Sequence, residues 1–392
     1  MRIVHCCFAC FYIDRYAYQE NLLPLQNFRD GHEVMILAST QTFENGREAY
    51  LEPGSYINEY GIPVVRLPYV PLGPKQVTRR LKKCAGITEQ LEAFKPELIY
   101  LHGLCSLSNP EVMRYAGKHP EVCVLSDTHA DANNSGTNWV SLHLLHRVIW
   151  RSVVYRLQPG IEKIYCISDE CLDFARENFL ADERKLVWFP LGVVCPTQEE
   201  YAARRQERRK ELGIGDDTLL FVHSGKMDKQ KRTPELLDAF AGTPGENMRL
   251  VIAGGFLPDI KEEAEKKIAA DKRVTFIGWQ NQEQLTSLLC AADVYVQPGS
   301  QSATMQNALG CGCAEMLYPH KSHIPYLKNG NGWFVETQAD MKDAFAQAAA
   351  DVPKVRRMGE ISRAYALETL DYSVLAKQMY ADCAAFKKRN GK

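Results

Sequence analysis

The chain contains 392 residues, 45% of them apolar, with 47 lysines and arginines against 48 aspartates and glutamates. This composition is typical of a folded globular protein and excludes wholesale disorder. The net charge of −1 argues against broad nucleic-acid binding, which needs a basic surface. The length exceeds that of one ordinary core and favours two domains.

The 13 cysteines are odd in number and have no repeated spacing, which favours reduced thiols in the cytoplasm over a secreted disulfide scaffold. Cys7 and Cys10 form a C-x-x-C pair, for which zinc binding and redox chemistry are the alternatives to packing. A zinc site needs a second ligand pair and a redox pair needs a thioredoxin-like context, so we expect packed thiols. The chain contains no run of about twenty uncharged apolar residues, so we expect no membrane-spanning segment.

Short apolar runs alternate with helical patterns along the chain, which predicts doubly wound α/β domains with parallel sheets. The strands expected in the first half are residues 2–8, 32–38, 64–67, 98–102, 122–126, 164–167 and 186–189. The helices expected there are residues 16–29, 82–94 and 169–178.

A charged stretch at 201–212 predicts a solvated connecting helix before a second, similar series. Its expected strands are residues 219–223, 249–253, 274–278, 294–297 and 314–317. Its expected helices are residues 234–241, 282–291, 304–309 and 354–392, the last with a break near 371. We therefore expect an N-terminal domain at 1–192, a C-terminal domain at 193–371 that faces it across a cleft, and a last helix, about 372–392, that packs back on the first domain.

Three polar clusters follow expected strands, where ligands of open parallel sheets bind. The first cluster, residues 127–134, is dense in Asp, His and Asn. His129 could contact a sugar hydroxyl or take a proton, with Asp127 or Asp131 orienting it. An Asx-rich turn is the alternative interpretation of this segment.

The second cluster, Ser224-Gly225-Lys226, follows a strand, and Lys231 opens the next helix. Two lysines around a glycine turn could hold a pyrophosphate near a helix N-terminus, and a solvated lysine-rich turn is the alternative. No G-x-G-x-x-G motif follows the first expected strand, and no G-x-x-x-x-G-K-[ST] motif occurs anywhere in the chain, which argues against dehydrogenases and P-loop ATPases. Residues 253–255 are expected to form only a tight turn.

The third cluster spans residues 298–307, between a strand and a helix. Its hydroxyl side chains compete for the N-cap position, where free backbone amides suit a phosphate. The side-chain amides of Gln306 and Asn307 both donate and accept hydrogen bonds, which suits vicinal sugar hydroxyls.

These motifs together resemble those of the family 4 (group 1) retaining glycosyltransferases. In the first half the similar segments are Gly31-His32-Glu33-Val34, Leu98-Ile99-Tyr100-Leu101-His102-Gly103 and Pro190-Leu191-Gly192-Val193. In the second half they are Gly225-Lys226-Met227 with Lys231, and Lys328-Asn329-Gly330-Asn331-Gly332. The resemblance covers nearly the whole length and implies the two-domain GT-B fold and a nucleotide-sugar donor.

The resemblance also implies roles for individual residues, such as pyrophosphate binding by two lysines and nucleobase contact by Trp279. The implied catalytic residues are His129, Lys226 and Lys231. The implied donor-binding residues are Gly225, Lys226, Lys231, Trp279, Gly299, Ser300, Gln301, Ser302, Ala303, Gln306 and Asn307. The implied residues of the acceptor and sugar cleft are Tyr18, Glu20, His102, Asp127 and His129.

One feature of the family is missing from the donor loop, the segment at residues 298–307 that the resemblance places against the donor sugar. The family has two glutamates eight positions apart, near the donor sugar and the ribose. Alignment on residues 311–312 places them at Gly299 and Asn307, and alignment on Pro298 places the first at Ser302, so neither alignment gives a carboxylate. The chain is similar to a branch with a Pro-Gly-x-Gln-Ser loop and an N-terminal Tyr-Gln-Glu-Asn, in which Asn307 could still bind ribose.

The resemblance implies transfer of a hexosyl group from a UDP or GDP sugar to a hydroxyl of a glycan or lipid-linked acceptor, with retention of configuration. It implies a role in cell-surface polysaccharide or glycoconjugate synthesis, and no metal or other cofactor. Because the glutamates are missing, a non-catalytic nucleotide-sugar or glycan-binding protein is the alternative. A nucleotide-sugar 2-epimerase is a further alternative, although it needs several carboxylates in the cleft.

Two stretches bear on membrane contact. Thr78–Lys83 is basic, and Leu142–Leu157 mixes arginines with Trp150, Val153 and Tyr155. Either stretch could lie on an anionic membrane surface, but a surface helix with one face packed on its own domain has the same pattern. We expect a cytoplasmic protein, with the inner face of the plasma membrane as the alternative location. The sequence predicts no nucleic-acid partner and no particular oligomeric state.

Overall fold

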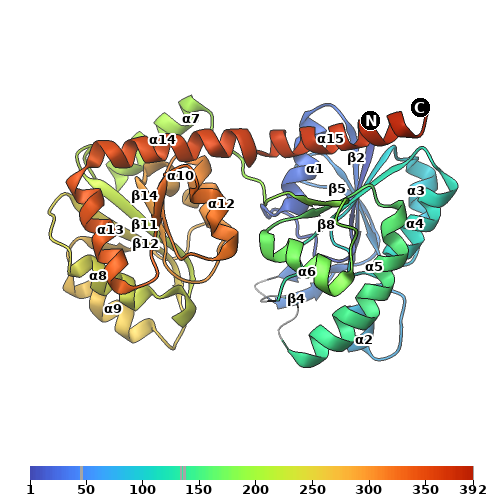
Figure 1. Ribbon diagram of the computed structural model, residues 1–392, viewed down its shortest axis with the longest axis horizontal. Helices are drawn as coiled ribbons and strands as arrows, with labels where there is room; N and C mark the ends of the chain where they lie inside the picture. The colour runs from blue at the N-terminus through green and yellow to red at the C-terminus, as the bar shows by residue number, and fades with distance from the viewer. Residues whose placement is uncertain (45–46, 133–134, 136–137, 392) are drawn as a thin grey trace. The chain divides into compact units, whose positions relative to one another are not determined.

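The computed structural model describes residues 1–44, 47–132, 135 and 138–391. The chain divides into two compact units (Figure 1). The first unit comprises Met1–Gly192 with Tyr372–Lys392, and the second comprises Val193–Asp371. Both are built on sheets of mainly parallel strands, so the predicted α/β class is confirmed.

An eight-stranded sheet forms the centre of the first unit, in the order β10-β9-β8-β7-β1-β2-β6-β5. Its strands are β1 (Arg2–Cys7), β2 (Glu33–Ser39), β5 (Gly54–Ile57), β6 (Pro63–Leu67), β7 (Leu98–Leu101), β8 (Cys123–Thr128), β9 (Lys163–Cys166) and β10 (Leu186–Trp188). All neighbours are parallel except β5, which runs antiparallel to β6 at one edge. Beside the sheet, β3 (Gln41–Glu44) and β4 (Arg47–Tyr50) form an antiparallel pair that the sequence did not predict.

Helices cover both faces of this sheet (Figure 1). They are α1 (Gln19–Arg29), α2 (Lys75–Leu81), α3 (Ile87–Phe94), α4 (Asn109–Lys118), η1 (Val140–Trp150), α5 (Arg151–Leu157), η2 (Gln158–Gly160), α6 (Asp169–Phe179) and α15 (Tyr372–Arg389). Of these, η1 has π-helical hydrogen bonding and continues directly into α5. The last helix, α15, returns to the first unit and packs beside α1.

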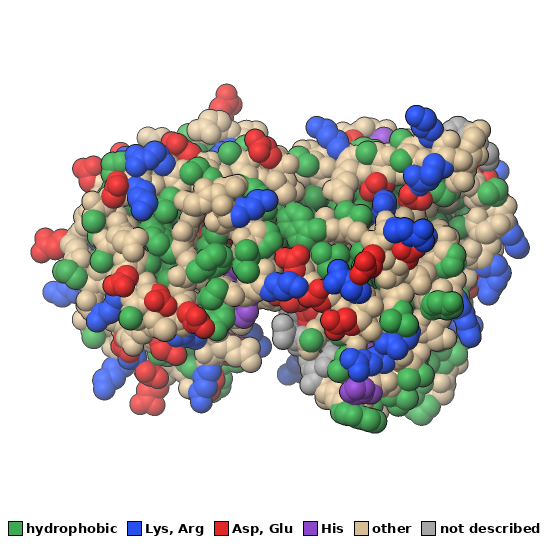
Figure 2. All heavy atoms as spheres, in the orientation of Figure 1, with side chains coloured by type: hydrophobic (Ala, Val, Ile, Leu, Met, Phe, Trp, Pro, Cys, Tyr) green, Lys and Arg blue, Asp and Glu red, His purple; other side chains and the backbone are tan. Residues whose placement is uncertain are grey.

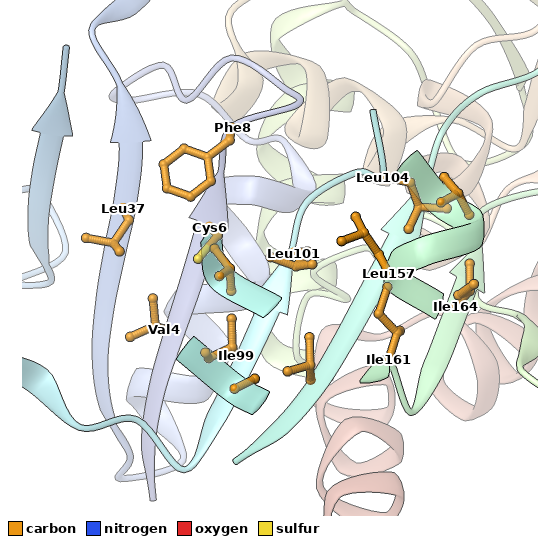
Figure 3. Close-up of a cluster of buried hydrophobic side chains, with 14 of the residues drawn as sticks. Val4, Cys6, Phe8, Leu37, Ile99, Leu101, Leu104, Leu157, Ile161 and Ile164 are labelled. Atoms are coloured by element: carbon orange, nitrogen blue, oxygen red, sulfur yellow. The ribbon is translucent and has the colours of Figure 1, made fainter. Parts of the chain in front are cut away.

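The core of the first unit explains why its strands are apolar on both sides. Along β1, side chains alternate between the two faces of the sheet, and every residue after Arg2 is buried. Val4 and Cys6 belong to a cluster with β7 and α5 (Figure 3). Ile3 belongs to a second cluster, which includes Met379 of α15. Burial on both faces therefore produces the continuous apolar run seen in the sequence.

A six-stranded parallel sheet, β13-β12-β11-β14-β15-β16, forms the centre of the second unit. Its strands are β11 (Leu219–Met227), β12 (Met248–Phe256), β13 (Val274–Phe276), β14 (Val294–Gln297), β15 (Ala314–Leu317) and β16 (Gly332–Phe334). Its helices are α7 (Gln198–Glu211), η3 (Lys229–Lys231), α8 (Thr233–Ala241), α9 (Lys261–Ala270), α10 (Gln282–Ala291), α11 (Thr304–Gly310), η4 (Lys321–His323), α12 (Ile324–Leu327), α13 (Gln338–Ala350) and α14 (Val352–Thr369).

Two sequence-based expectations about local structure are wrong. The helix expected at 82–94 begins only at Ile87, because Lys82 ends α2 in the left-handed region with a φ of 51° and Gly86 has a φ of 84°. The tight turn expected at 253–255 lies inside β12, which pairs in register with β11. The glycines there allow β11 and β12 to approach each other closely. In a sequence, glycines at a close approach of two strands look the same as glycines in a turn.

Candidate functional site

The order of the strands identifies where a ligand can approach each sheet. In the first unit β1 lies between β2 and β7, and in the second β11 lies between β12 and β14. The connections leave these central strands in opposite directions, which opens a crevice at the carboxyl ends of the strands. The predicted polar clusters follow strands that end at these two edges.

A cavity of about 630 Å³ lies in the first unit at this edge of the sheet. Four residues expected in the acceptor and sugar cleft line it together, namely Glu20, His102, Asp127 and His129. Tyr18 is not among the lining residues, because it caps the start of α1 with half of its surface exposed and packs against Tyr16.

Asp127, near the end of β8, is fully buried and contacts two of the histidines that line the cavity. Its Oδ2 lies 3.3 Å from His102 Nδ1 and 3.5 Å from His129 Nε2. Gln19 Nε2 donates a hydrogen bond to the same oxygen at 3.1 Å, and the Tyr100 hydroxyl donates another at 3.2 Å. Asp127, one of the two partners proposed for His129 from the sequence, contacts this histidine.

A chain of hydrogen bonds behind the cavity fixes the protons of His102. Asn27 Nδ2 donates to the Tyr380 hydroxyl at 2.8 Å, so Asn27 Oδ1 accepts from His5 Nε2 at 2.8 Å. His5 Nδ1 is therefore the acceptor for His102 Nε2–H at 3.0 Å. A protonated His102 then directs its Nδ1–H toward Asp127.

The pKa shifts of the cluster agree with this proton arrangement. Burial raises the pKa of Asp127, but the charge of His129 and the contacts with both histidines outweigh burial and hold this pKa well below its usual range. Burial lowers the pKa of His102, but Cys7 and Asp127 reverse this effect and raise it to about 9. Burial, together with the charge of His102, lowers the pKa of His5. Asp127 therefore carries a negative charge and His102 a positive one at neutral pH.

His129 is the histidine of this cluster that a ligand can reach. Its side chain is 39% exposed, whereas that of His102 is 1% exposed. Asp127 outweighs the effect of burial and raises the pKa of His129. An accessible imidazole that is oriented by a buried carboxylate can, in its protonated form, donate a hydrogen bond to an oxygen atom in the cavity.

Several cavity residues were not predicted as site residues from the sequence, namely Cys10, Arg79, Arg80, Lys82, His146 and Trp150. The basic segment that contains the three cations was singled out only for membrane contact. Its place beside the cavity depends on the loop between β6 and α3, which no local pattern specifies. Of the C-x-x-C pair, Cys7 is buried and Cys10 lines the cavity, and all 13 cysteines are free thiols.

In the second unit, Lys231 is buried against the donor loop, residues 298–307. Its Nζ donates hydrogen bonds to the carbonyl oxygens of Ser300 at 3.3 Å and Gln301 at 3.2 Å, and the residue is 8% exposed. Burial lowers the pKa of Lys231 from 10.5 to about 8, although nearby Asp228 partly opposes this effect. A buried ammonium next to a polar loop is an electrostatic site for an anion.

Glycines allow the backbone segments around Lys231 to come close. A Cβ atom on Gly254 would lie 1.8 Å from the Gly225 carbonyl oxygen, and one on Gly299 would lie 1.9 Å from the Gln230 carbonyl oxygen. Side chains at either position would therefore push the donor loop or β12 away from Lys231.

The other residues predicted to bind the donor differ in accessibility. Lys226, Trp279, Ala303 and Asn307 are exposed, and Trp279 is 73% exposed. Ser302 Oγ accepts a long hydrogen bond from Thr304 N–H, 3.4 Å, at the start of α11. Gln306 is buried and its Nε2 donates to the Tyr326 hydroxyl at 3.2 Å, so it is held by the protein itself.

Within the described ranges, no group of three or more His, Cys, Asp and Glu side chains is arranged to hold a metal ion. In the same ranges, no helix is both long enough and apolar enough to cross a bilayer. Residues 133–134 of the predicted Asp-, His- and Asn-rich loop lie outside the described part of the chain.

Comparison with known families and structures agrees with this architecture. Residues 204–365 match the family model for glycosyl transferases group 1. No curated protein sequence matches the chain. The family match lies within the unit that carries Lys231 and the donor loop.

Solved structures share the fold over the whole chain. Sucrose-phosphate synthase from Thermosynechococcus elongatus is 16% identical with a TM-score of 0.67, covering 98% of this chain and 99% of its own. Anabaena HepE in complex with UDP is 14% identical with a TM-score of 0.67, covering 98% and 100%. An α,α-trehalose-phosphate synthase (UDP-forming) from Burkholderia vietnamiensis is 13% identical with a TM-score of 0.63, covering 98% and 100%. The fold is the GT-B fold of glycosyltransferases, as the sequence predicted.

Proposed function

We infer that the chain transfers a sugar from a nucleotide-sugar donor to a hydroxyl group of an acceptor. The observation that carries this inference is the buried ammonium of Lys231 beside the donor loop, in the segment that matches the group 1 family model. A nucleoside diphosphate leaving group develops negative charge as the glycosidic bond breaks. A preorganised cation in a site shielded from water stabilises that charge strongly.

In this proposal, the second unit binds the donor. Lys231 and the exposed Lys226 contact the pyrophosphate, Trp279 contacts the base, and the donor loop contacts the sugar and ribose. UDP donors are the first to test, because HepE, which shares the fold, was solved in complex with UDP. We propose a retaining reaction in which the acceptor hydroxyl attacks the face that the diphosphate leaves, without a metal.

The cavity of the first unit is the proposed acceptor site. Its accessible His129 would donate a hydrogen bond to a sugar oxygen, while buried Asp127 keeps the ring oriented and raises the pKa of the imidazole. Glu20, also in the lining, would accept hydrogen bonds from acceptor hydroxyls. Glycans and lipid-linked glycans of the cell surface are the acceptor class that we propose, and the cytoplasm is the proposed location.

A specific observation favours a second candidate, a nucleotide-sugar-binding protein without activity. The donor loop, residues 298–307, contains no carboxylate where the family has glutamates. One experiment separates the candidates: nucleotide release measured over a panel of UDP and GDP sugars, with binding followed by thermal shift. Turnover that Lys231→Ala reduces at least about tenfold, with Lys229→Ala as an exposed control, supports the enzyme. Binding without turnover supports the second candidate, and absence of binding contradicts both.

A further inference from the structure

The helix formed by η1 and α5 exposes a stripe of large apolar side chains. From 51% to 72% of each of these side chains is exposed, and they are Trp139, Val140, Leu144, Val148 and Tyr155. Trp139 immediately precedes η1, and the next three residues recur every four positions, close to one π-helical turn. They therefore form one continuous face, named here the apolar stripe.

The opposite face of the same helix is already packed on the first unit. Trp150, Val154 and Leu157 are buried in its core. His146 packs edge-on against Phe174 of α6, with ring centroids 5.2 Å apart. Packing on its own unit therefore accounts for the inner face of the helix and leaves the apolar stripe unexplained.

The charged residues of the helix that carries the apolar stripe and of the nearby segment at residues 75–83 are all basic. Residues 139–157 contain three arginines and residues 75–83 contain five lysines or arginines, and neither segment contains an aspartate or glutamate. Arg147 and Arg151 donate to uncharged groups at the end of α6. Of the basic residues in the second segment, Arg79 is paired with Glu48. Hydrophobic and basic side chains lie next to one another at the lower right of Figure 2, over this helix.

Both basic segments border the acceptor cavity. Arg79 and Arg80 of α2 line it, and so do Val140, Ser141 and Leu145 of η1. The helix that carries the apolar stripe and the segment at residues 75–83 therefore lie beside the same cavity, and the surface that they form borders it.

We propose that this surface docks on an anionic phospholipid bilayer. The apolar stripe inserts among the headgroups and acyl chains, and the flanking lysines and arginines pair with lipid phosphates. A second copy of this chain is a poorer occupant, because a symmetric contact would oppose the same basic segments and repel. If the proposed function also holds, the acceptor that reaches the cavity is anchored in that bilayer.

The test is flotation of the full chain with vesicles, without nucleotide or acceptor. Vesicles of phosphatidylcholine with about 30% phosphatidylglycerol should bind the protein, and pure phosphatidylcholine should bind it at least about tenfold less. Raising NaCl from about 0.1 M to about 0.5 M should weaken binding to the anionic vesicles at least about tenfold.

Matched variants assign the binding to the apolar stripe. Leu144→Ser with Val148→Ser changes two exposed residues that do not line the cavity, and it should reduce vesicle binding at least about tenfold. The control, Ile361→Ser with Leu367→Ser, changes two exposed residues of α14 and should bind as the unchanged protein does. Circular dichroism establishes that each variant is folded.

Three results would overturn the proposal. These are absence of binding to anionic vesicles, equal binding by the Leu144/Val148 variant, and a dimer in sedimentation equilibrium that this variant abolishes without any vesicle binding. Because the assay contains no donor, a failure of glycosyl transfer leaves the membrane result unchanged. Conversely, transfer to a soluble acceptor can persist when vesicle binding fails, so the two conclusions are tested separately.

Discussion

Replacement of Lys231 by methionine should stabilise the ligand-free protein and weaken nucleotide binding at the same time. Lys231 is 8% exposed, and its ammonium is held by two carbonyl oxygens of the donor loop. Methionine has a similar length but no charge, so it keeps most of the packing of the lysine stem. The variant therefore separates the destabilising effect of the buried charge on the folded protein from the contribution of that charge to nucleotide binding.

The magnitude follows from the pKa of Lys231. Its lowering from 10.5 to about 8 means that the charged form is disfavoured by about 3 kcal/mol relative to an exposed lysine. Loss of two hydrogen bonds in the methionine variant costs about 1 kcal/mol each. We therefore expect the ligand-free variant to gain about 1 kcal/mol in the free energy of unfolding at pH 7.

Nucleotide binding should respond in the opposite direction. A charge-assisted contact with a phosphate contributes about 1.5–3 kcal/mol, so Lys231→Met should weaken UDP binding about 10- to 100-fold. In the unchanged protein the free lysine loses its proton above pH 8, and binding of the diphosphate then requires proton uptake. The affinity should fall by up to about tenfold per pH unit above pH 8, and this slope should be absent in the variant.

The assays are urea unfolding at pH 7 without ligand, and UDP titration calorimetry from pH 7 to 9.5. Lys229→Met is the matched control, because Lys229 is exposed and lies two positions away. The reasoning is refuted if Lys231→Met binds UDP as the control does, or if the two proteins share the same pH dependence. A large loss of stability in Lys231→Met would instead contradict the assigned cost of the buried charge.

Three further predictions concern the two sites. Asp127→Asn should lower the pKa of His102 from about 9, measured by NMR titration, because one of the groups that oppose the effect of burial loses its charge. Tyr380→Phe should move the titration of His102 to lower pH and should leave the fold intact, because the side-chain amide of Asn27, which orients His5, loses its hydrogen bond to the Tyr380 hydroxyl. An unchanged titration would show that this chain of hydrogen bonds does not affect the pKa of His102. Gly254→Ala should lower the free energy of unfolding by about 3 kcal/mol, because the added Cβ atom would meet the backbone of Gly225. Gly255→Ala is the control: its Cβ atom would point into open space, so it should change the free energy of unfolding by less than about 0.5 kcal/mol. Equal effects of the two substitutions would contradict the close approach of β11 and β12.

The sequence by itself determined the fold class and the edges of the sheets at which the polar loops gather. Apolar runs such as β1 and β14 are local signals, because a parallel strand buried on both faces needs apolar residues at consecutive positions. The loops that follow β8 and β14 were located for the same reason, since a strand's end and its polar loop are adjacent in sequence.

Only the tertiary structure decided how these residues interact. His5 and His102 are 97 positions apart, and Tyr380 reaches Asn27 from 353 positions away, so no local pattern could assign the protons of this cluster. The burial that lowers the pKa of Lys231 likewise comes from a loop about 70 positions further along the chain.

The helix of residues 139–157 shows the same division. Its composition fits both a packed surface helix and a membrane-contacting one, because both need apolar residues at helical spacing. Tertiary packing decided which residues are covered: Trp150 and Val154 are in the core, while Leu144 and Val148 are exposed. Composition fixes how much apolar surface a segment carries, but only the neighbours supplied by the rest of the chain decide how much of it is removed from water.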